Sequence, residues 1–156
     1  MQKIHPFLWF DTQAEDAARF YVSVFRNSKM GEIVRYGDAG PGPKGAVMTV
    51  SFELEGLPFT ALNGGPVFKF NESISFSVDC HSQAEVDELW EKLSDGGETG
   101  QCAWLKDRFG VSWQIVPSIL PELLADPDPV KSQRVMAAML RMTKIDIAKL
   151  KAAYAG

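Results

Sequence analysis

The sequence predicts an α+β fold of two βαβββ modules followed by a C-terminal helical tail. Two short motifs, T-Q-A-E from Thr12 and S-Q-A-E from Ser82, begin 70 positions apart (82 − 12). Each follows a strand-like run, opens an amphipathic helical pattern and precedes three further strand-like runs. A four-letter match is weak evidence alone, but the shared order of elements around it favours a repeat. We assign residues 1–66 to the first module, 67–117 to the second and 118–156 to the tail, within a single globular domain.

The composition is that of an ordinary soluble protein and argues against nucleic-acid and membrane partners. Of 156 residues, 46% are hydrophobic and 23% are charged, with a net charge of −4. No basic run is present, so we expect no nucleic-acid partner, and the short apolar runs predict no membrane span. The first residues lack the apolar core of a signal peptide, and Cys80 and Cys102 form no metal-type or disulfide framework. We therefore expect a cytoplasmic protein with reduced thiols.

The first module begins with an aromatic-rich strand, Ile4–Phe10, in which His5, Phe7 and Trp9 share one face. In the following capping box, the Thr12 hydroxyl is expected to accept from the Glu15 amide. The helix then carries apolar residues at helical spacing until about Asn27. Three strands follow, at residues 29–36, 46–54 and 57–62. The glycine-rich segment 37–45, G-D-A-G-P-G-P-K-G, has a composition similar to that of a phosphate-binding loop. Its prolines lack the amide hydrogens that would bind a phosphate, and no helix follows, so we interpret it as a hairpin loop.

The second module repeats this order. Residues 73–79, S-I-S-F-S-V-D, alternate with serines on one face, and the helix opened by Ser82 stops at Gly96-Gly97. Strand-like runs follow at 98–105 and from Gly110. In the tail, Asp128-Pro129 predicts one helix start and Thr143–Asp146 another. We expect these helices to cover a sheet face or a subunit seam, and interpret the methionines of their apolar stripe as packing residues.

The stretch Lys106–Pro117 carries the most informative polar residue. In its strand, Ser112, Gln114 and Val116 share one face, while Val111, Trp113 and Ile115 share the other. A polar side chain in mid-strand needs partners if it is buried, and a wet cavity or a ligand would supply them. The serine face of residues 73–79 indicates such a cavity for the same reason. For His5, the alternatives are a buried histidine bonded to backbone or to Gln114, or a ligand-binding or general-base residue.

These features resemble the vicinal oxygen chelate superfamily, the glyoxalase, bleomycin-resistance and dioxygenase fold. Within it, the chain is most similar to the PhnB-like proteins of the 3-demethylubiquinone-9 3-methyltransferase family. The stretches that carry the resemblance are His5–Phe10 with the T-Q-A-E helix, Ala61–Pro66, Trp104–Pro117 and Lys144–Ala148. The resemblance implies that two incomplete barrels pair around a cavity. A methyltransferase of the usual kind needs a doubly wound sheet and a glycine-rich turn, and neither is visible, so we treat that label as a name only.

The resemblance also implies where a site lies. Metal enzymes of the superfamily place ligands at positions that correspond to His5, Thr60, Ser73 (Ser75 if the halves align without a gap) and Gln114. Only His5 is a strong metal ligand here, and Gln114 is a weak one. We therefore expect an incomplete metal site and no cofactor, although binding of a divalent metal stays an alternative. The expected pocket residues are His5, Phe7, Trp9, Thr60, Ser73, Ser75, Trp104 and Gln114.

Three functional classes follow from these expectations, the third being a structural or regulatory partner that works through the helical tail. The first is a metal-free homodimer that binds a small molecule. The second is a lyase, isomerase or dioxygenase in which His5 and Gln114 are catalytic, with a divalent ion or with His5 as base.

Overall fold

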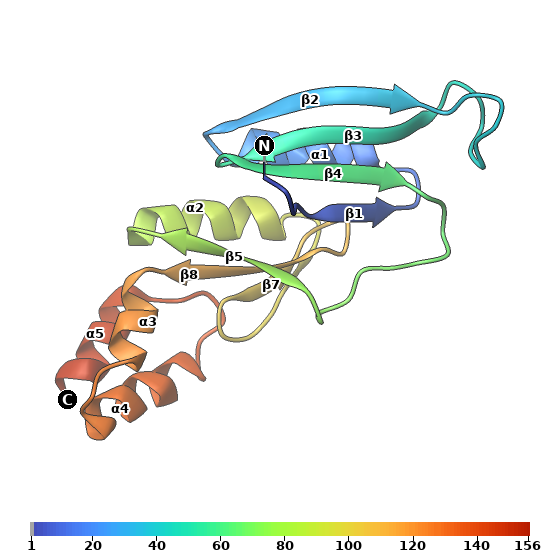
Figure 1. The fold of residues 1–156 in the computed structure, drawn as a ribbon. Helices are drawn as coiled ribbons and strands as arrows, with labels where there is room; N and C mark the ends of the chain where they lie inside the picture. The colour runs from blue at the N-terminus through green and yellow to red at the C-terminus, as the bar shows by residue number, and fades with distance from the viewer. Residues whose placement is uncertain (1) are drawn as a thin grey trace. The chain divides into compact units, whose positions relative to one another are not determined.

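The protein is represented by a computed structural model in which residues 2–156 are described. Two βαβββ repeats are followed by three helices (Figure 1). The first repeat comprises β1 (Phe7–Phe10), α1 (Ala14–Val24), β2 (Ser28–Arg35), β3 (Val47–Leu54) and β4 (Leu57–Asn63). The second comprises β5 (Ser75–Cys80), α2 (Gln83–Ser94), β6 (Glu98–Thr99), β7 (Trp104–Lys106) and β8 (Ser112–Pro117). The tail comprises α3 (Ile119–Leu124), α4 (Pro129–Met139) and α5 (Ile147–Ala155).

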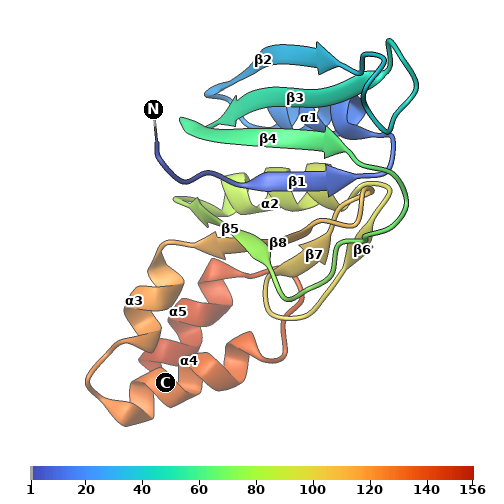
Figure 2. The ribbon, with the colours of Figure 1, turned by 45° about the vertical axis from the view of Figure 1, so that its right-hand side comes forward.

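Both repeats fold with the same topology, which confirms the predicted α+β class. One sheet has the strand order β1-β4-β3-β2 and the other the order β5-β8-β7-β6 (Figure 2). In each sheet the first strand runs parallel to the last, and the remaining pairs are antiparallel. The chain divides into two compact units, one ending at Phe70 and the other spanning Asn71–Gly156. We call them the first and second units.

In the first unit, α1 covers one face of the sheet. Its buried side chains, Ala14, Ala17, Ala18, Tyr21 and Val24, lie at helical spacing. They pack on the alternating buried residues of β3 and β4, and Tyr21 stacks on Phe52 with ring centroids 6.2 Å apart. Leu8 and Phe10 are buried while Phe7 is exposed, so β1 presents two different faces, as its alternation predicts.

The predicted Thr12 cap is wrong. Helix α1 begins at Ala14, and the side chain of its N-cap residue, Gln13, makes no cap hydrogen bond. The Ala14 amide donates to Asn63 Oδ1 at 2.8 Å instead. The cap therefore comes from the end of β4, a position distant in sequence. In α2 the predicted cap is confirmed, because Ser82 Oγ accepts from the Glu85 amide at 3.1 Å.

The second sheet departs from the prediction at two strand boundaries. Strand β5 begins at Ser75, because Ser73 lies in a turn and donates its hydroxyl to Asn71 Oδ1 at 2.5 Å. The single run predicted over residues 98–105 is two short strands. Between them Cys102 and Ala103 adopt φ values of 55° and 78°, a left-handed conformation that ends strand pairing.

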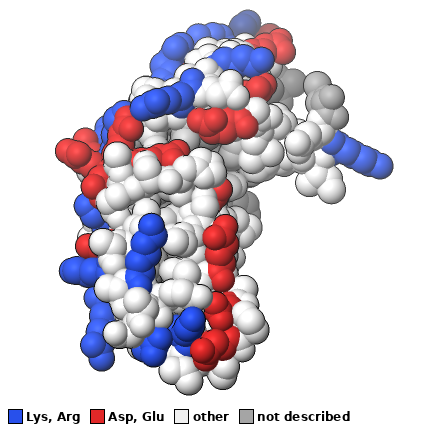
Figure 3. Space-filling model, turned by 90° about the vertical axis from the view of Figure 1, so that its left-hand side faces the viewer, with Lys and Arg blue, Asp and Glu red and all other residues white. Residues whose placement is uncertain are grey.

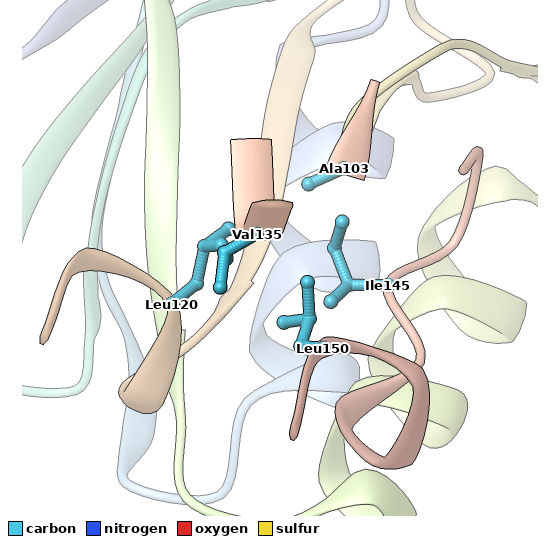
Figure 4. Close-up of a cluster of buried hydrophobic side chains, with 5 residues drawn as sticks. All are labelled: Ala103, Leu120, Val135, Ile145 and Leu150. Atoms are coloured by element: carbon cyan, nitrogen blue, oxygen red, sulfur yellow. The ribbon is translucent and has the colours of Figure 1, made fainter. Parts of the chain in front are cut away.

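The tail helices gather beside the end of β8 (Figures 1 and 2). Their core joins Leu120, Val135, Ile145 and Leu150 to Ala103 in the turn between β6 and β7 (Figure 4). The strained turn is held by the same region: the Cys102 amide donates to Met142 O and the Ala103 amide to Thr143 O, both at 2.9 Å.

Two of the three tail helices were predicted. Asp128 caps α4, with Pro129 at its first position, and Asp146 caps α5 by accepting from the Lys149 amide at 3.1 Å. Helix α3 was not predicted. Pro121 lies in its first turn, where a proline removes no helical hydrogen bond, so it is compatible with the helix.

The chain between the two repeats packs on β1. Phe68 makes an edge-to-face contact with Trp9 at a centroid separation of 5.0 Å, and Phe70 makes one with Phe10 at 5.1 Å. Such aromatic pairs contribute on the order of 1 kcal/mol each beyond their buried area. These contacts explain why the first compact unit extends to Phe70.

No helix among residues 2–156 is long and apolar enough to cross a membrane. On the face shown in Figure 3, acidic and basic side chains are interspersed. That face carries no broad patch of a single sign for a polyanion to bind.

Candidate functional site

The two repeats place a hydrogen-bonded polar pair at equivalent positions, although His5 lies two residues before β1 and not inside the strand predicted over Ile4–Phe10. In the first unit, His5 Nε2 lies 3.2 Å from Thr60 Oγ1, and in the second, Gln114 Nε2 donates to Ser75 Oγ at 2.9 Å. The 70-residue offset of the capping motifs relates His5 to Ser75 (75 − 5), and an offset of 54 relates Thr60 to Gln114 (114 − 60).

The strand registers support this equivalence. Phe7 pairs with Thr60 in β1 and β4, and Ser77 pairs with Gln114 in β5 and β8; both pairs obey the same two offsets. The second member of the sequence-predicted set is therefore Ser75. Ser73 is exposed, outside the strand and bonded to Asn71, so it does not match His5.

The polar pair of the first unit stands on the sheet face that α1 leaves uncovered. Phe7 is the register partner of Thr60 and is 57% exposed. Trp9 is half-buried, and its indole N–H donates to Gly65 O at 2.9 Å. A side chain at Gly64 would collide with the Trp9 ring, so this glycine lets the chain after β4 fold over the tryptophan. Trp9 is thus fixed in place by its own unit.

The polar pair of the second unit has charged and aromatic neighbours. Trp104 is the register partner of Gln114, and Ser112 is the register partner of both Ser75 and Lys106. Paired and alternate residues share a sheet face, so five side chains stand together. We call this group the Gln114 face, made of Ser75, Trp104, Lys106, Ser112 and Gln114.

An ion pair stands at this face that the sequence did not predict. Lys106 Nζ contacts the Glu72 carboxylate, and this hydrogen bond lowers the pKa of Glu72 and raises that of Lys106. Glu98, the register partner of Lys106 on β6, adds a more distant negative charge. Alternation from Trp104 to Lys106 could have placed the lysine, but nothing in the sequence marked Glu72 as its partner.

The donors at these two positions do not fit a divalent metal. His5 is the one strong ligand among them; the others are two hydroxyls and an amide, without a carboxylate to supply charge. Among residues 2–156, no cluster of three or more His, Cys, Asp or Glu could hold a metal ion.

The remaining reactive groups have structural partners. His81 Nδ1 lies 3.0 Å from Ser118 Oγ at the end of β8. Burial raises the pKa of the Cys80 thiol to about 12, with smaller contributions from the charges of Glu85 and Asp79. A thiol in this state is neutral near pH 7 and is a poor nucleophile.

Two pockets lie away from the predicted site residues. The first, of about 560 Å³, is bounded by the start of α1, the 41–47 segment and residues 63–65, and its rim carries Asp11, Glu15 and Asp16. The second, of about 530 Å³, lies between the starts of α2 and α5. At the wall of the second pocket, Lys144 Nζ lies 2.8 Å from Asp87 Oδ1 in an ion pair. The hydrogen bond from Lys144 lowers the pKa of Asp87. Sequence reasoning identified neither pocket as a site.

A family model described as 3-demethylubiquinone-9 3-methyltransferase matches residues 2–116. The chain belongs to this family. A Bacillus cereus structure described as a 3-demethylubiquinone-9 3-methyltransferase, PhnB protein, is 34% identical with a TM-score of 0.69. The similarity covers 75% of this chain and 100% of that one. The tail lies beyond the part of this chain that the family model matches.

More distant structures share the fold. Protein PA1353 of Pseudomonas aeruginosa is 23% identical, with a TM-score of 0.61 over 75% of this chain and 98% of that one. The fosfomycin resistance protein FosX of Listeria monocytogenes is 16% identical, with a TM-score of 0.58 over 80% of this chain and 98% of that one. No curated protein matches the chain. The resemblance to the PhnB-like family and to the vicinal oxygen chelate fold is thereby confirmed.

Proposed function

We propose that this PhnB-like protein binds a small, partly aromatic or apolar molecule without a resident metal or other cofactor. The observation that carries the proposal is the repeated polar pair, His5–Thr60 in the first unit and Ser75–Gln114 in the second. Each pair stands beside an aromatic side chain, Phe7 or Trp104, at its paired strand position. Apolar walls with a few placed polar groups are typical of small-molecule sites.

We do not propose methyl transfer for this protein on the basis of the family's name. A methyltransferase of the usual kind uses a doubly wound parallel sheet, whereas both sheets described here are mixed and four-stranded. A second candidate is an enzyme with His5 as a metal-free acid or base. The 3.2 Å contact between His5 Nε2 and Thr60 Oγ1 favours it, because the imidazole is already hydrogen-bonded to a hydroxyl and is exposed. We also propose a cytoplasmic homodimer, to be tested by its mass in solution.

Binding can be tested with a panel of neutral aromatic alcohols and amides, by thermal shift and then by calorimetry. We expect His5→Ala and Gln114→Ala each to weaken binding of the best compound by about tenfold, the value of one buried hydrogen bond. His81→Ala is the matched control, because it removes a histidine that is also bonded to a hydroxyl. Binding that neither His5→Ala nor Gln114→Ala changes would overturn the site.

Metal and catalysis can be examined with the same variants. Elemental analysis of protein purified without chelators or a histidine tag should find no stoichiometric metal. Metal present in the wild type and lost in His5→Ala would favour a metal-dependent lyase, isomerase or dioxygenase. Turnover of a bound compound that His5→Ala abolishes, without metal, would favour the His5-assisted enzyme.

A further inference from the structure

Ser112 is the most unusual polar residue of the second unit. Its side chain is 1% exposed, and within residues 2–156 its hydroxyl has no hydrogen-bond partner. A buried hydroxyl left unpaired loses its hydrogen bonds to water without replacement, so folded proteins seldom retain one. The residue lies on the central strand of its sheet, between Ser75 on one side and Lys106 on the other. An unpaired hydroxyl of this kind is a candidate for a group that binds a ligand, and the side chains that cover it must move for a ligand to reach it.

The Gln114 face around Ser112 is rich in hydrogen-bond donors. Lys106 supplies an ammonium group, and Gln114 supplies an amide that now donates to Ser75 Oγ at 2.9 Å. Trp104 adds an aromatic surface next to the amide. A carboxylate fits this set, because it accepts several hydrogen bonds and carries the charge that Lys106 requires.

Lys106 already has such a group beside it. The carboxylate of Glu72, which lies in the turn before β5, contacts the lysine Nζ. The Glu72 side chain is 56% exposed and that of Lys106 is 39% exposed. An ion pair this exposed is weakened by solvent screening, so a competing carboxylate can replace Glu72.

We propose that the Gln114 face binds the carboxylate of an acidic, aromatic small molecule, with Lys106 as its counter-ion and Ser112 as a hydrogen-bond donor. Glu72 occupies Lys106 until that ligand displaces it. The inference deepens the proposed binding function by naming the charge of the ligand, and it rests on that function.

The test compares two probes of the same size, 3-phenylpropanoate and 3-phenylpropanamide, of which only the first carries a negative charge and two acceptor oxygens. Their dissociation constants are measured by NMR titration, from the side-chain signals of Trp104 and Gln114. We expect the acid to bind more tightly than the amide. Glu72→Gln should strengthen binding of the acid several-fold because it frees the lysine, and Lys106→Gln should weaken it by about tenfold while leaving the amide within about twofold.

Ser112→Ala separates the buried hydroxyl from the charge. It leaves no partner unpaired in the folded protein, so we expect it to fold normally and to weaken acid binding by about threefold to tenfold. Ser28→Ala is its control, since Ser28 Oγ in the first unit is also buried and without a partner among the described residues. Glu53→Gln is the control for Glu72, because it breaks the exposed Lys29–Glu53 pair at 3.4 Å.

Each outcome bears on the proposal. Equal affinity for acid and amide, or no response to Glu72→Gln and Lys106→Gln, would overturn the carboxylate site while leaving the binding function intact. Binding of the acid that Ser112→Ala does not alter would remove Ser112 from the site. If neither probe shifts the Trp104 and Gln114 signals, the inference fails; if the neutral panel also finds no ligand, the proposed function fails with it.

Discussion

Replacing Asn63 should lower the free energy of unfolding more than replacing Thr12 or Ser82, the hydroxyl residues that begin the two capping motifs. Asn63 Oδ1 accepts from the Ala14 amide at 2.8 Å, and its Nδ2 donates to Val47 O at 3.1 Å. One side chain thus caps α1 and ties the end of β4 to the start of β3. Ala14 is fully buried, so water cannot replace the lost acceptor.

The magnitude follows from these contacts. Removing a helix cap costs about 0.5–2 kcal/mol, and a second hydrogen bond contributes about 0.5–1.5 kcal/mol. We therefore expect Asn63→Ala to lower the free energy of unfolding by about 2–3 kcal/mol. Asn63→Asp keeps an acceptor for Ala14 but loses the donor to Val47, and should have about half that effect.

The assay is urea denaturation followed by far-ultraviolet circular dichroism, with hydrogen exchange of the Ala14 amide as the local readout. Thr12→Ala is the internal control, because Thr12 does not cap α1, and its effect should stay within about 0.5 kcal/mol. Ser82→Ala should cost about 1 kcal/mol, as the true cap of α2. If Thr12→Ala costs as much as Ser82→Ala while Asn63→Ala costs less than about 0.5 kcal/mol, the assignment of the α1 cap is wrong.

Three further predictions follow from the second unit. Leu150→Ala should lower the free energy of unfolding by about 2–5 kcal/mol by opening a cavity in the tail core, measured by urea denaturation. Asp107→Asn should cost about 2–4 kcal/mol, because this carboxylate is 3% exposed and accepts from two amides and the Trp113 indole; the altered tryptophan fluorescence reports the change. Cys80 should resist iodoacetamide at pH 8 in the folded protein, and its raised pKa should make stability fall as pH rises above the usual thiol value of 9.0, since the unfolded chain ionises first.

The repeat was predictable because local signals agreed with the global topology. The strand alternation, the two helical stripes and the loop compositions each indicated the same element order, and the structure repeats it in both units. The Ser82 cap was predictable for the same reason, since its donor lies three residues away.

The errors arose where a partner distant in sequence decides the local structure. Thr12 has the right residue type for a cap, but Asn63 reaches the helix from the end of β4. The offset of 54 relates Asn63 to Pro117, which has no side-chain acceptor, and there the helix uses its own Ser82. The same motif therefore caps one helix and not the other. The break at Cys102–Ala103 depends likewise on carbonyls supplied by the tail.

The structure brings four of the sequence-predicted residues together in two pairs, and it adds neighbours that the sequence did not predict. Alternation predicted His5, Thr60, Ser75 and Gln114 on strand faces; the structure has His5 just before β1 and the other three within strands, and it pairs all four within their own units. The ion pair of Lys106 could not be predicted, because Glu72 reaches it from the turn before β5, where no local pattern marks a partner.

The difference between the 70-residue and 54-residue offsets explains why the equivalent polar pairs of the two units have different neighbours. The second repeat is 16 residues shorter between its helix and its last strand (70 − 54), and its β6 and β7 have two and three residues where β2 and β3 have eight each. The first unit keeps the 37–45 loop and the acidic pocket beside it. The second unit instead has a short strand that places Trp104 and Lys106 next to Gln114. A repeat therefore fixes where a polar pair stands, while the lengths of the neighbouring strands determine which charge a ligand meets beside it.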